Sequence, residues 1–265
     1  MLKDTGLTDV SRKTSITYKI IRSLVWFFYP KMRVYGAENL PDGPFIAAGN
    51  HSQMNGPIAC ELYFPGKHYI WCIAQMMDMK LVPAYAYNDF WSQKPVCIRW
   101  FYRILSYIIA PIAQCIFTNA DTIPVYKDKR IIETVDLSLC RLKEGAGVVI
   151  FPEDYTEYNN IVHRFQRGFV SVAKRFYAES KVPVPFVPLY VCPALKALYI
   201  GKPITYDPER PVKEEQERIC KYLMDSISEM AYELPRHRVV PYPNISKKEY
   251  PYNDRIKPEN EETSS

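Results

Sequence analysis

The sequence of this 265-residue chain lacks several features that would assign it to a well-known class. It contains seven cysteines but no C-x-x-C pair, the spacing used by zinc sites and redox motifs, so no metal site is expected. It contains no glycine-rich phosphate loop, which argues against a nucleotide-binding enzyme. The first dozen residues are polar and lack the apolar core of a signal peptide.

A long uninterrupted apolar run is also missing. The most apolar region covers residues 98–118, and Arg99, Arg103 and Pro111 fall within it. Because a membrane-spanning helix needs roughly 20 consecutive apolar residues, we predict one or two surface-seeking or buried helices there rather than a span.

The cysteines are scattered, odd in number and mostly in apolar surroundings. Such residues are typical of buried thiols in a reducing compartment, so we expect the protein on the cytoplasmic side. The seven are Cys60, Cys72, Cys97, Cys115, Cys140, Cys192 and Cys220.

Positive charge is concentrated near the amino terminus. Residues 1–33 hold seven Lys or Arg against two Asp, an excess equal to the net charge of the whole chain, +5. This asymmetry indicates a surface that meets an anionic partner, and the total is too small to indicate nucleic acid. The 21 Tyr, 12 Phe and 4 Trp fill cores, and they also favour the boundary between water and lipid.

Residues 15–29 have the pattern of a basic amphipathic helix that stops at Pro30. Lys19 and Arg22 lie off its apolar face. A helix of this kind that carries Trp26 can lie in the membrane interface, and packing on the protein body is an equal alternative. The apolar face consists of Ile16, Ile20, Leu24, Phe27 and Phe28.

The rest of the chain alternates short apolar runs with helical patterns, which predicts an α/β fold: one domain with a largely parallel mixed sheet flanked by helices. We expect that domain over residues 33–239, after an amphipathic membrane-surface arm at 1–32 and before a tail at 240–265 that is disordered or draped over the body. Strands are expected at 32–36, 45–49, 68–74, 121–127, 147–151, 184–191 and 195–204, and helices at 57–64, 130–143, 168–178 and 213–232.

Polar side chains follow three of the expected strands. His51 stands between an apolar strand and a helix start, in the segment "GNHSQMNGPI". "FPEDYTE" follows the strand at 147–151, and Lys127 ends another. Because ligands and catalytic groups gather at the carboxyl edge of such a sheet, these groups are expected to converge there.

The order and spacing of these motifs resemble the phospholipid/glycerol acyltransferase family, whose familiar members are bacterial lysophosphatidic acid acyltransferases. The likeness covers about residues 33–205. It is carried by "YGAENLPDGPFIAAGNH" (35–51), "GAGVVIFPE" (145–153), "FQRG" (165–168) and "VPFVPLY" (184–190).

The resemblance implies that His51 is the general base for an acceptor hydroxyl, which attacks an acyl thioester of coenzyme A or acyl carrier protein. The thioester is a co-substrate, and no other cofactor is implied. Lys127 matches a residue that contacts phosphate, and Glu153 matches the glutamate of the acceptor-binding motif. The expected catalytic residues are His51, Asn50 and Asn55, and the expected substrate-binding residues are Lys127, Glu153, Pro152, Phe151, Asp154 and Arg167.

The sequence departs from the family pattern at Gly56, where the family has the aspartate that pairs with the histidine. That carboxylate holds the imidazole tautomer and stabilises the imidazolium. Several groups remain open as substitutes to orient His51: Asn55, a backbone carbonyl, Asp78, Asp89 or Asp154.

A second departure follows Glu153. Asp154, Tyr155 and Thr156 stand where the family usually has Gly-Thr-Arg, so the arginine that would grip an acceptor phosphate is missing. Arg164 and Arg167 are the candidates to replace it, and an acceptor other than a glycerol phosphate stays open.

The favoured interpretation is therefore an O-acyltransferase of phospholipid biosynthesis with a lysophospholipid- or glycerol-phosphate-like acceptor. It is expected to be peripheral on an anionic membrane surface. The alternative is a catalytically silent relative that binds lipid or acyl chains. A hydrolase is disfavoured because the chain has no G-x-S-x-G motif.

Overall fold

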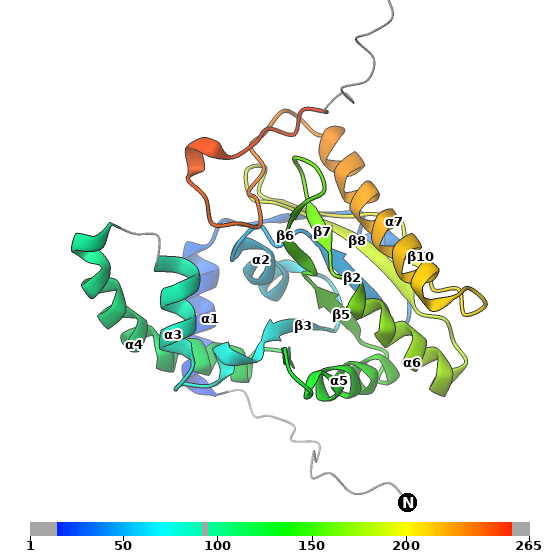
Figure 1. Cartoon of the computed structure of the whole chain (residues 1–265), viewed down its shortest axis with the longest axis horizontal. Helices are drawn as coiled ribbons and strands as arrows, with labels where there is room; N and C mark the ends of the chain where they lie inside the picture. The colour runs from blue at the N-terminus through cyan, green and yellow to red at the C-terminus, as the bar shows by residue number, and fades with distance from the viewer. Residues whose placement is uncertain (1–14, 92–94, 256–265) are drawn as a thin grey trace, which may run out of the picture. The chain divides into compact units, whose positions relative to one another are not determined.

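The computed structural model describes residues 15–91 and 95–255 (Figure 1). Contacts divide the chain into two compact units. The smaller one joins the chain up to Tyr29 with Gln75–Thr122, and the larger one joins Pro30–Ala74 with the chain from Ile123 onward.

The larger unit is built on a mixed sheet, which has eight strands in the described part of the chain. Its central strands β8, β2, β5 and β3 all run parallel. β9 is antiparallel to β8 and parallel to β1, β10 is antiparallel to β8, and β4 lies beyond β3. The strands are β1 Arg33–Tyr35, β2 Ile46–Gly49, β3 His68–Ile73, β4 Thr122–Val125, β5 Gly147–Ile150, β8 Pro185–Cys192, β9 Ala197–Ile200 and β10 Ile204–Thr205.

The central parallel strands are apolar on both faces. Every residue of β2 and β5 is buried, as expected for strands with helices over both sides. Alternate residues such as Ile46 and Val148 join one large core with side chains of the helices α5, α6 and α7. The helices of this unit are α2 Asn55–Tyr63, α5 Ile131–Lys143, α6 Ser171–Ser180 and α7 Val212–Tyr232. The predicted α/β fold with a largely parallel mixed sheet is confirmed.

A two-stranded antiparallel hairpin, β6 Glu153–Glu157 and β7 His163–Phe165, follows β5 directly. The sequence did not predict it, because "EDYTE" is acidic and has no apolar alternation. The hairpin turns the chain back at the carboxyl end of β5, and it fixes the position of Glu153.

The smaller unit is helical: α1 Ile16–Phe28, α3 Val82–Ala86, the π-helical turn Tyr87–Trp91 and α4 Val96–Asn119. The predicted helix at 15–29 is confirmed. The region at 98–118, expected as one or two helices, is a single helix that continues through Pro111.

The expected boundaries at residues 32 and 239 stay a prediction, since the two units group the chain by contacts and not by arm, domain and tail. Lys3, Arg12 and Lys13 of the basic amino terminus, and residues 256–265 of the tail, lie outside the described residues. The described part of the tail is draped over the larger unit: Asn253 Nδ2 donates to the Ala231 carbonyl at 2.7 Å.

Candidate active site

The segment after β2 is locked to β8 by Asn50. This side chain is buried, its Oδ1 accepts from the Val191 backbone N–H at 2.7 Å, and its Nδ2 donates to the Val191 carbonyl at 3.1 Å and to Ser52 Oγ at 2.9 Å. The amide thus continues the β2–β8 ladder beyond the last strand residue. Asn50 fixes the place where His51 leaves the sheet.

The imidazole of His51 is oriented by a backbone carbonyl of its own loop. Its Nδ1 makes a hydrogen bond with the carbonyl oxygen of Gln53. A carbonyl oxygen only accepts, so Nδ1 carries the hydrogen, and Nε2 of the neutral ring carries the lone pair. A backbone carbonyl, one of the open substitutes, therefore makes the hydrogen bond that orients the ring.

The carbonyl reaches the ring because two consecutive residues adopt left-handed backbone. Ser52 has φ +46° and Gln53 has φ +56°, backbone values that residues other than glycine rarely adopt. Each such residue costs on the order of 1 kcal/mol, so the surrounding contacts must hold the loop. Asn55 contributes by donating from Nδ2 to the Ser52 carbonyl at 2.9 Å.

Gly56 leaves no room for the aspartate that the family has there. A Cβ at this position would lie 2.5 Å from the His51 carbonyl oxygen and 2.8 Å from a ring carbon of Phe151. The Gly56 N–H also donates to the His51 carbonyl at 3.0 Å. A side chain at residue 56 would thus require α2 or the histidine loop to shift.

The candidate carboxylates make other contacts. Asp78 accepts from the Lys80 backbone N–H at 2.9 Å, and Asp154 accepts from the Thr156 backbone N–H at 2.7 Å. The side chain of Asp89 lies outside the described residues.

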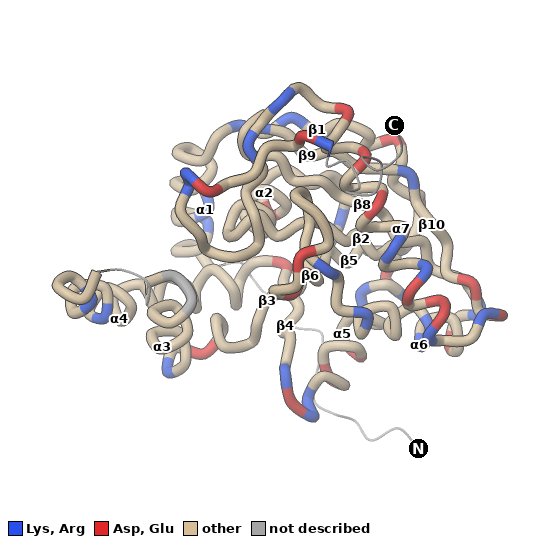
Figure 2. Tube along the Cα trace, turned by 45° about the horizontal axis from the view of Figure 1, so that its top comes forward, with Lys and Arg blue, Asp and Glu red and all other residues tan. Residues whose placement is uncertain are grey.

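Glu153 supports the backbone of His51. It is only 3% exposed, its Oε2 accepts from the His51 N–H at 2.5 Å, and its Oε1 accepts from the His163 N–H at 2.9 Å. Burial raises the pKa of this carboxyl to about 7, against the effect of the two N–H donors. The predicted convergence of "FPEDYTE" with His51 at one edge of the sheet is confirmed for Glu153, in a hairpin whose acidic residues Figure 2 marks.

Two aromatic rings from later in the sequence lie close to the imidazole. The Phe151 ring lies 5.4 Å from that of His51, and the Tyr242 ring lies 5.7 Å from it. The centre of the Tyr242 ring also lies 5.1 Å from that of Tyr155 and 6.1 Å from that of His163. The sequence did not predict that Tyr242 lies beside His51, because nothing in the unpatterned tail indicates contact with a loop nearly 200 residues earlier. Pro152 is buried beside this cluster, and its carbonyl accepts from Gln166 at 2.8 Å.

Comparison with known proteins decides the family. The acyltransferase family model matches residues 31–192, more than half of the chain. The chain belongs to the acyltransferase family. No curated protein matches it at a significant level.

Among solved structures, this acyltransferase resembles the 1-acyl-sn-glycerophosphate (LPA) acyltransferase PlsC from Thermotoga maritima, which is 18% identical in sequence. The match covers 81% of this chain and 78% of that one, with a TM-score of 0.43.

Two expected substrate-binding residues of this acyltransferase, Lys127 and Arg167, are exposed. Lys127 is exposed after β4, which is separated from β2 by β5 and β3, about 14 Å across the sheet. Arg167 is exposed and forms an ion pair with Glu217 of α7 at 3.2 Å. Hydrogen bonds hold Asn50, His51 and Glu153 together at one edge of the sheet, and substrate contact by Lys127 and Arg167 stays a prediction.

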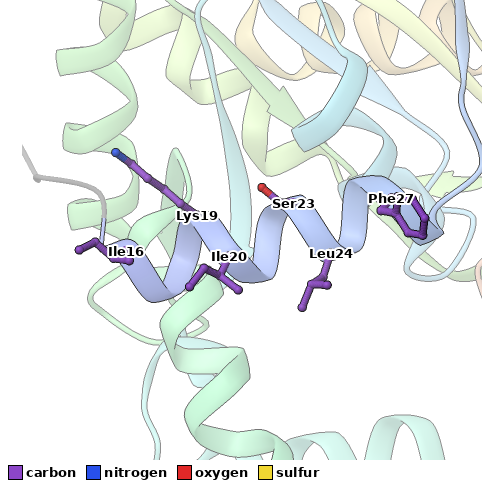
Figure 3. A pocket seen from close by; sticks show the side chains of 6 residues that line it. All are labelled: Ile16, Lys19, Ile20, Ser23, Leu24 and Phe27. Atoms are coloured by element: carbon purple, nitrogen blue, oxygen red, sulfur yellow. The ribbon is translucent and has the colours of Figure 1, made fainter.

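The smaller unit of this acyltransferase exposes an apolar surface. Ile16, Phe27 and Phe28 of α1 are 73–78% exposed. Figure 3 shows Ile16, Ile20 and Leu24 projecting from one side of α1, with Lys19 projecting from another. On α4, the large exposed residues are Val96, Ile98, Trp100, Phe101, Ile104, Tyr107, Ile108 and Ile112.

By length and composition alone, α4 could cross a membrane, and little of its most apolar stretch is buried. In the described part of the chain, no cluster of three His, Cys, Asp or Glu side chains is arranged to hold a metal ion.

Proposed function

We propose that this protein transfers a fatty acyl group from an acyl thioester, of coenzyme A or acyl carrier protein, to a hydroxyl of a lysophospholipid- or glycerol-phosphate-like acceptor. The observation that carries this proposal is the hydrogen bond from His51 Nδ1 to the Gln53 carbonyl. It leaves the basic lone pair on Nε2, at the carboxyl edge of the sheet of a family whose reaction needs a base.

In this mechanism, His51 Nε2 takes the proton of the acceptor hydroxyl as its oxygen attacks the thioester carbonyl carbon. The tetrahedral intermediate then collapses, the carbon–sulfur bond breaks, and the imidazolium returns the proton to the leaving thiolate. The products are an ester and a free thiol. The carbonyl of Gln53 fixes the tautomer as an aspartate would, and it stabilises the imidazolium through a dipole instead of a full charge.

The acceptor headgroup is the part of the proposal that depends on the family resemblance. Arg167 forms an ion pair with Glu217, and the family's arginine after Glu153 is absent from the sequence, which favours a headgroup held by other groups, or one without phosphate. A panel of acceptors with and without phosphate therefore belongs in the first assay.

The test is acyl transfer from long-chain acyl-CoA and acyl-ACP to lysolipids and simple alcohols, with vesicles present, for the wild type and His51→Ala. We expect ester product from the wild type and a loss of about 10²–10⁴-fold in the variant. Thiol release without ester would indicate hydrolysis. Lipid binding with no turnover across the panel would support the silent relative and overturn the proposal.

We also propose that the protein is peripheral on an anionic membrane, on its cytoplasmic side. Support comes from the exposed apolar residues of α1 and α4. Neither residues 15–29 nor residues 95–119 contain Asp or Glu, while Lys19, Arg22, Arg99 and Arg103 supply positive charge (Figure 2). Amphipathic basic helices with aromatic residues favour the interface of anionic bilayers. Resistance of the bound protein to alkaline carbonate extraction would instead indicate that α4 spans the bilayer.

A further inference from the structure

The carboxyl-terminal segment covers the loop that holds His51. We define this segment, residues 240–250, as the strap. Gln53 Nε2 donates to the Tyr250 hydroxyl oxygen at 3.0 Å and lies 3.4 Å from the Pro243 carbonyl oxygen. Ser52 Oγ lies 3.4 Å from the Val240 carbonyl oxygen. Both residues with left-handed backbone are thus tied to the strap.

The two ends of the strap are themselves fixed to the larger unit. The Val239 N–H donates to the Pro251 carbonyl at 2.8 Å, and the His237 N–H donates to Asn253 Oδ1 at 2.7 Å. His237 is buried and makes a 2.7 Å hydrogen bond with Tyr190 of β8. The strap is therefore a loop whose two ends are joined to each other and anchored to β8 through His237. It can hold the histidine loop in place.

Gln53 has two functions in this arrangement. Its main-chain carbonyl orients the His51 ring, and its side chain is anchored by Tyr250. Because left-handed backbone is unfavourable for glutamine, the loop needs outside contacts to keep this carbonyl aimed at the ring. The Tyr250 hydroxyl is such a contact, 197 residues away in the sequence.

We propose that Tyr250 is a positioning residue that sets the tautomer of His51 through Gln53. This inference rests on the proposed role of His51 as general base. If the carbonyl moves away, the proton of the neutral ring is no longer confined to Nδ1. The Nε2–H form then appears, and it has no lone pair on Nε2 with which to accept the hydroxyl proton.

The test compares Tyr250→Phe, which removes one hydroxyl, with the matched control Tyr252→Phe. Tyr252 lies two residues further along, and its hydroxyl accepts from Arg238 rather than from Gln53. The primary readout is the ¹⁵N NMR spectrum of the imidazoles at pH 8. The chain has four histidines, and His51→Ala identifies the signals of residue 51.

In the wild type and Tyr252→Phe, we expect one dominant His51 tautomer with the hydrogen on Nδ1. Tyr250→Phe is expected to add the Nε2–H form and to lower kcat about three- to tenfold with little change in KM, the size of one lost hydrogen bond. An unchanged His51 tautomer in Tyr250→Phe would overturn the inference, as would equal effects of the two variants. Full activity of His51→Ala would instead overturn the proposed base, and the NMR result would still report on the Tyr250 link.

Discussion

The two units of this protein differ in which side chains they bury and which they expose. Around His51, in the larger unit, polar groups such as Asn50 and Glu153 are buried and hydrogen-bonded to backbone. In the smaller unit, large apolar side chains such as Phe27 and Trp100 face outward. A buried polar network costs free energy unless each member is satisfied, and an exposed apolar surface costs free energy unless it meets a partner.

The difference agrees with the functions proposed for the two units. In the larger unit, buried polar groups hold the His51 ring and the backbone turn after it in a fixed geometry. Proton transfer needs such a geometry. The smaller unit leaves apolar area available for contact, which is what affinity for a lipid surface needs. Changes in the first unit should therefore alter stability and turnover, and changes in the second should alter vesicle binding.

The largest expected effect comes from restoring the family's aspartate. Gly56→Asp would force a Cβ to within 2.5 Å of the His51 carbonyl and would bury a carboxylate beside Phe151. We expect a loss of at least about 3 kcal/mol in the free energy of unfolding, and lower activity. Urea unfolding and the acyl-transfer assay measure the two effects.

Two controls separate the causes. Gly56→Ala adds only the Cβ, so it isolates the steric clash. Gly168→Ala adds a Cβ that meets nothing within 4 Å and should be close to neutral. Higher activity in Gly56→Asp at unchanged stability would show that α2 can move aside, and that the carbonyl of Gln53 is not the ring's main support.

The next effect concerns the charge state of Glu153. Its carboxyl has a pKa of about 7 when folded and 4.5 as the reference for the unfolded chain. Between these values the folded protein holds a proton that the unfolded chain releases, so this residue lowers stability as pH rises from about 4.5 through 7. Glu153→Gln does not titrate, and its single amide oxygen can accept from only one of the two N–H groups, those of His51 and His163, that Glu153 holds.

We therefore expect Glu153→Gln to be less stable than the wild type near pH 4, because one N–H donor loses its acceptor, and to gain on it by up to about 3 kcal/mol between about pH 4 and pH 8. Unfolding of both proteins across this range measures the difference. Subtracting the two curves removes the opposite contributions of His163 and His237, whose pKa values are lowered by burial. A variant that loses stability relative to the wild type as pH rises would show that the two N–H donors outweigh burial.

The sequence predicted the sheet of the larger unit well, because β2 and β5 are continuous apolar runs and the helices have regular apolar faces. It also predicted that His51 and Glu153 meet, since both follow central parallel strands. The sequence did not predict the hairpin β6–β7, because its first strand is acidic and has no apolar alternation.

The support of His51 could not be read from the sequence for a different reason. The carbonyl of Gln53 has the same chemistry as any other backbone carbonyl, and only the left-handed conformation of Ser52 and Gln53 aims it at the ring. That conformation depends on contacts with Tyr250, which no local pattern reveals. Lys127 was expected at the same site because it ends a strand; that strand, β4, lies beyond β3, and contact of Lys127 with the substrate stays a prediction.

The smallest expected effect tests the smaller unit. Ile20→Ser combined with Phe27→Ser removes two exposed apolar side chains of α1, which should leave the fold intact and weaken binding to anionic vesicles roughly tenfold or more. Co-sedimentation at low and high salt measures it, and Val182→Ser, an exposed apolar residue of the larger unit, is the control. If the salt dependence is kept while affinity falls, the apolar residues and the basic residues Lys19 and Arg22 act separately on the bilayer. Unchanged sedimentation of the double variant would show that these side chains of α1 do not contribute to vesicle binding. The exposed residues of α4 would then be tested in the same way.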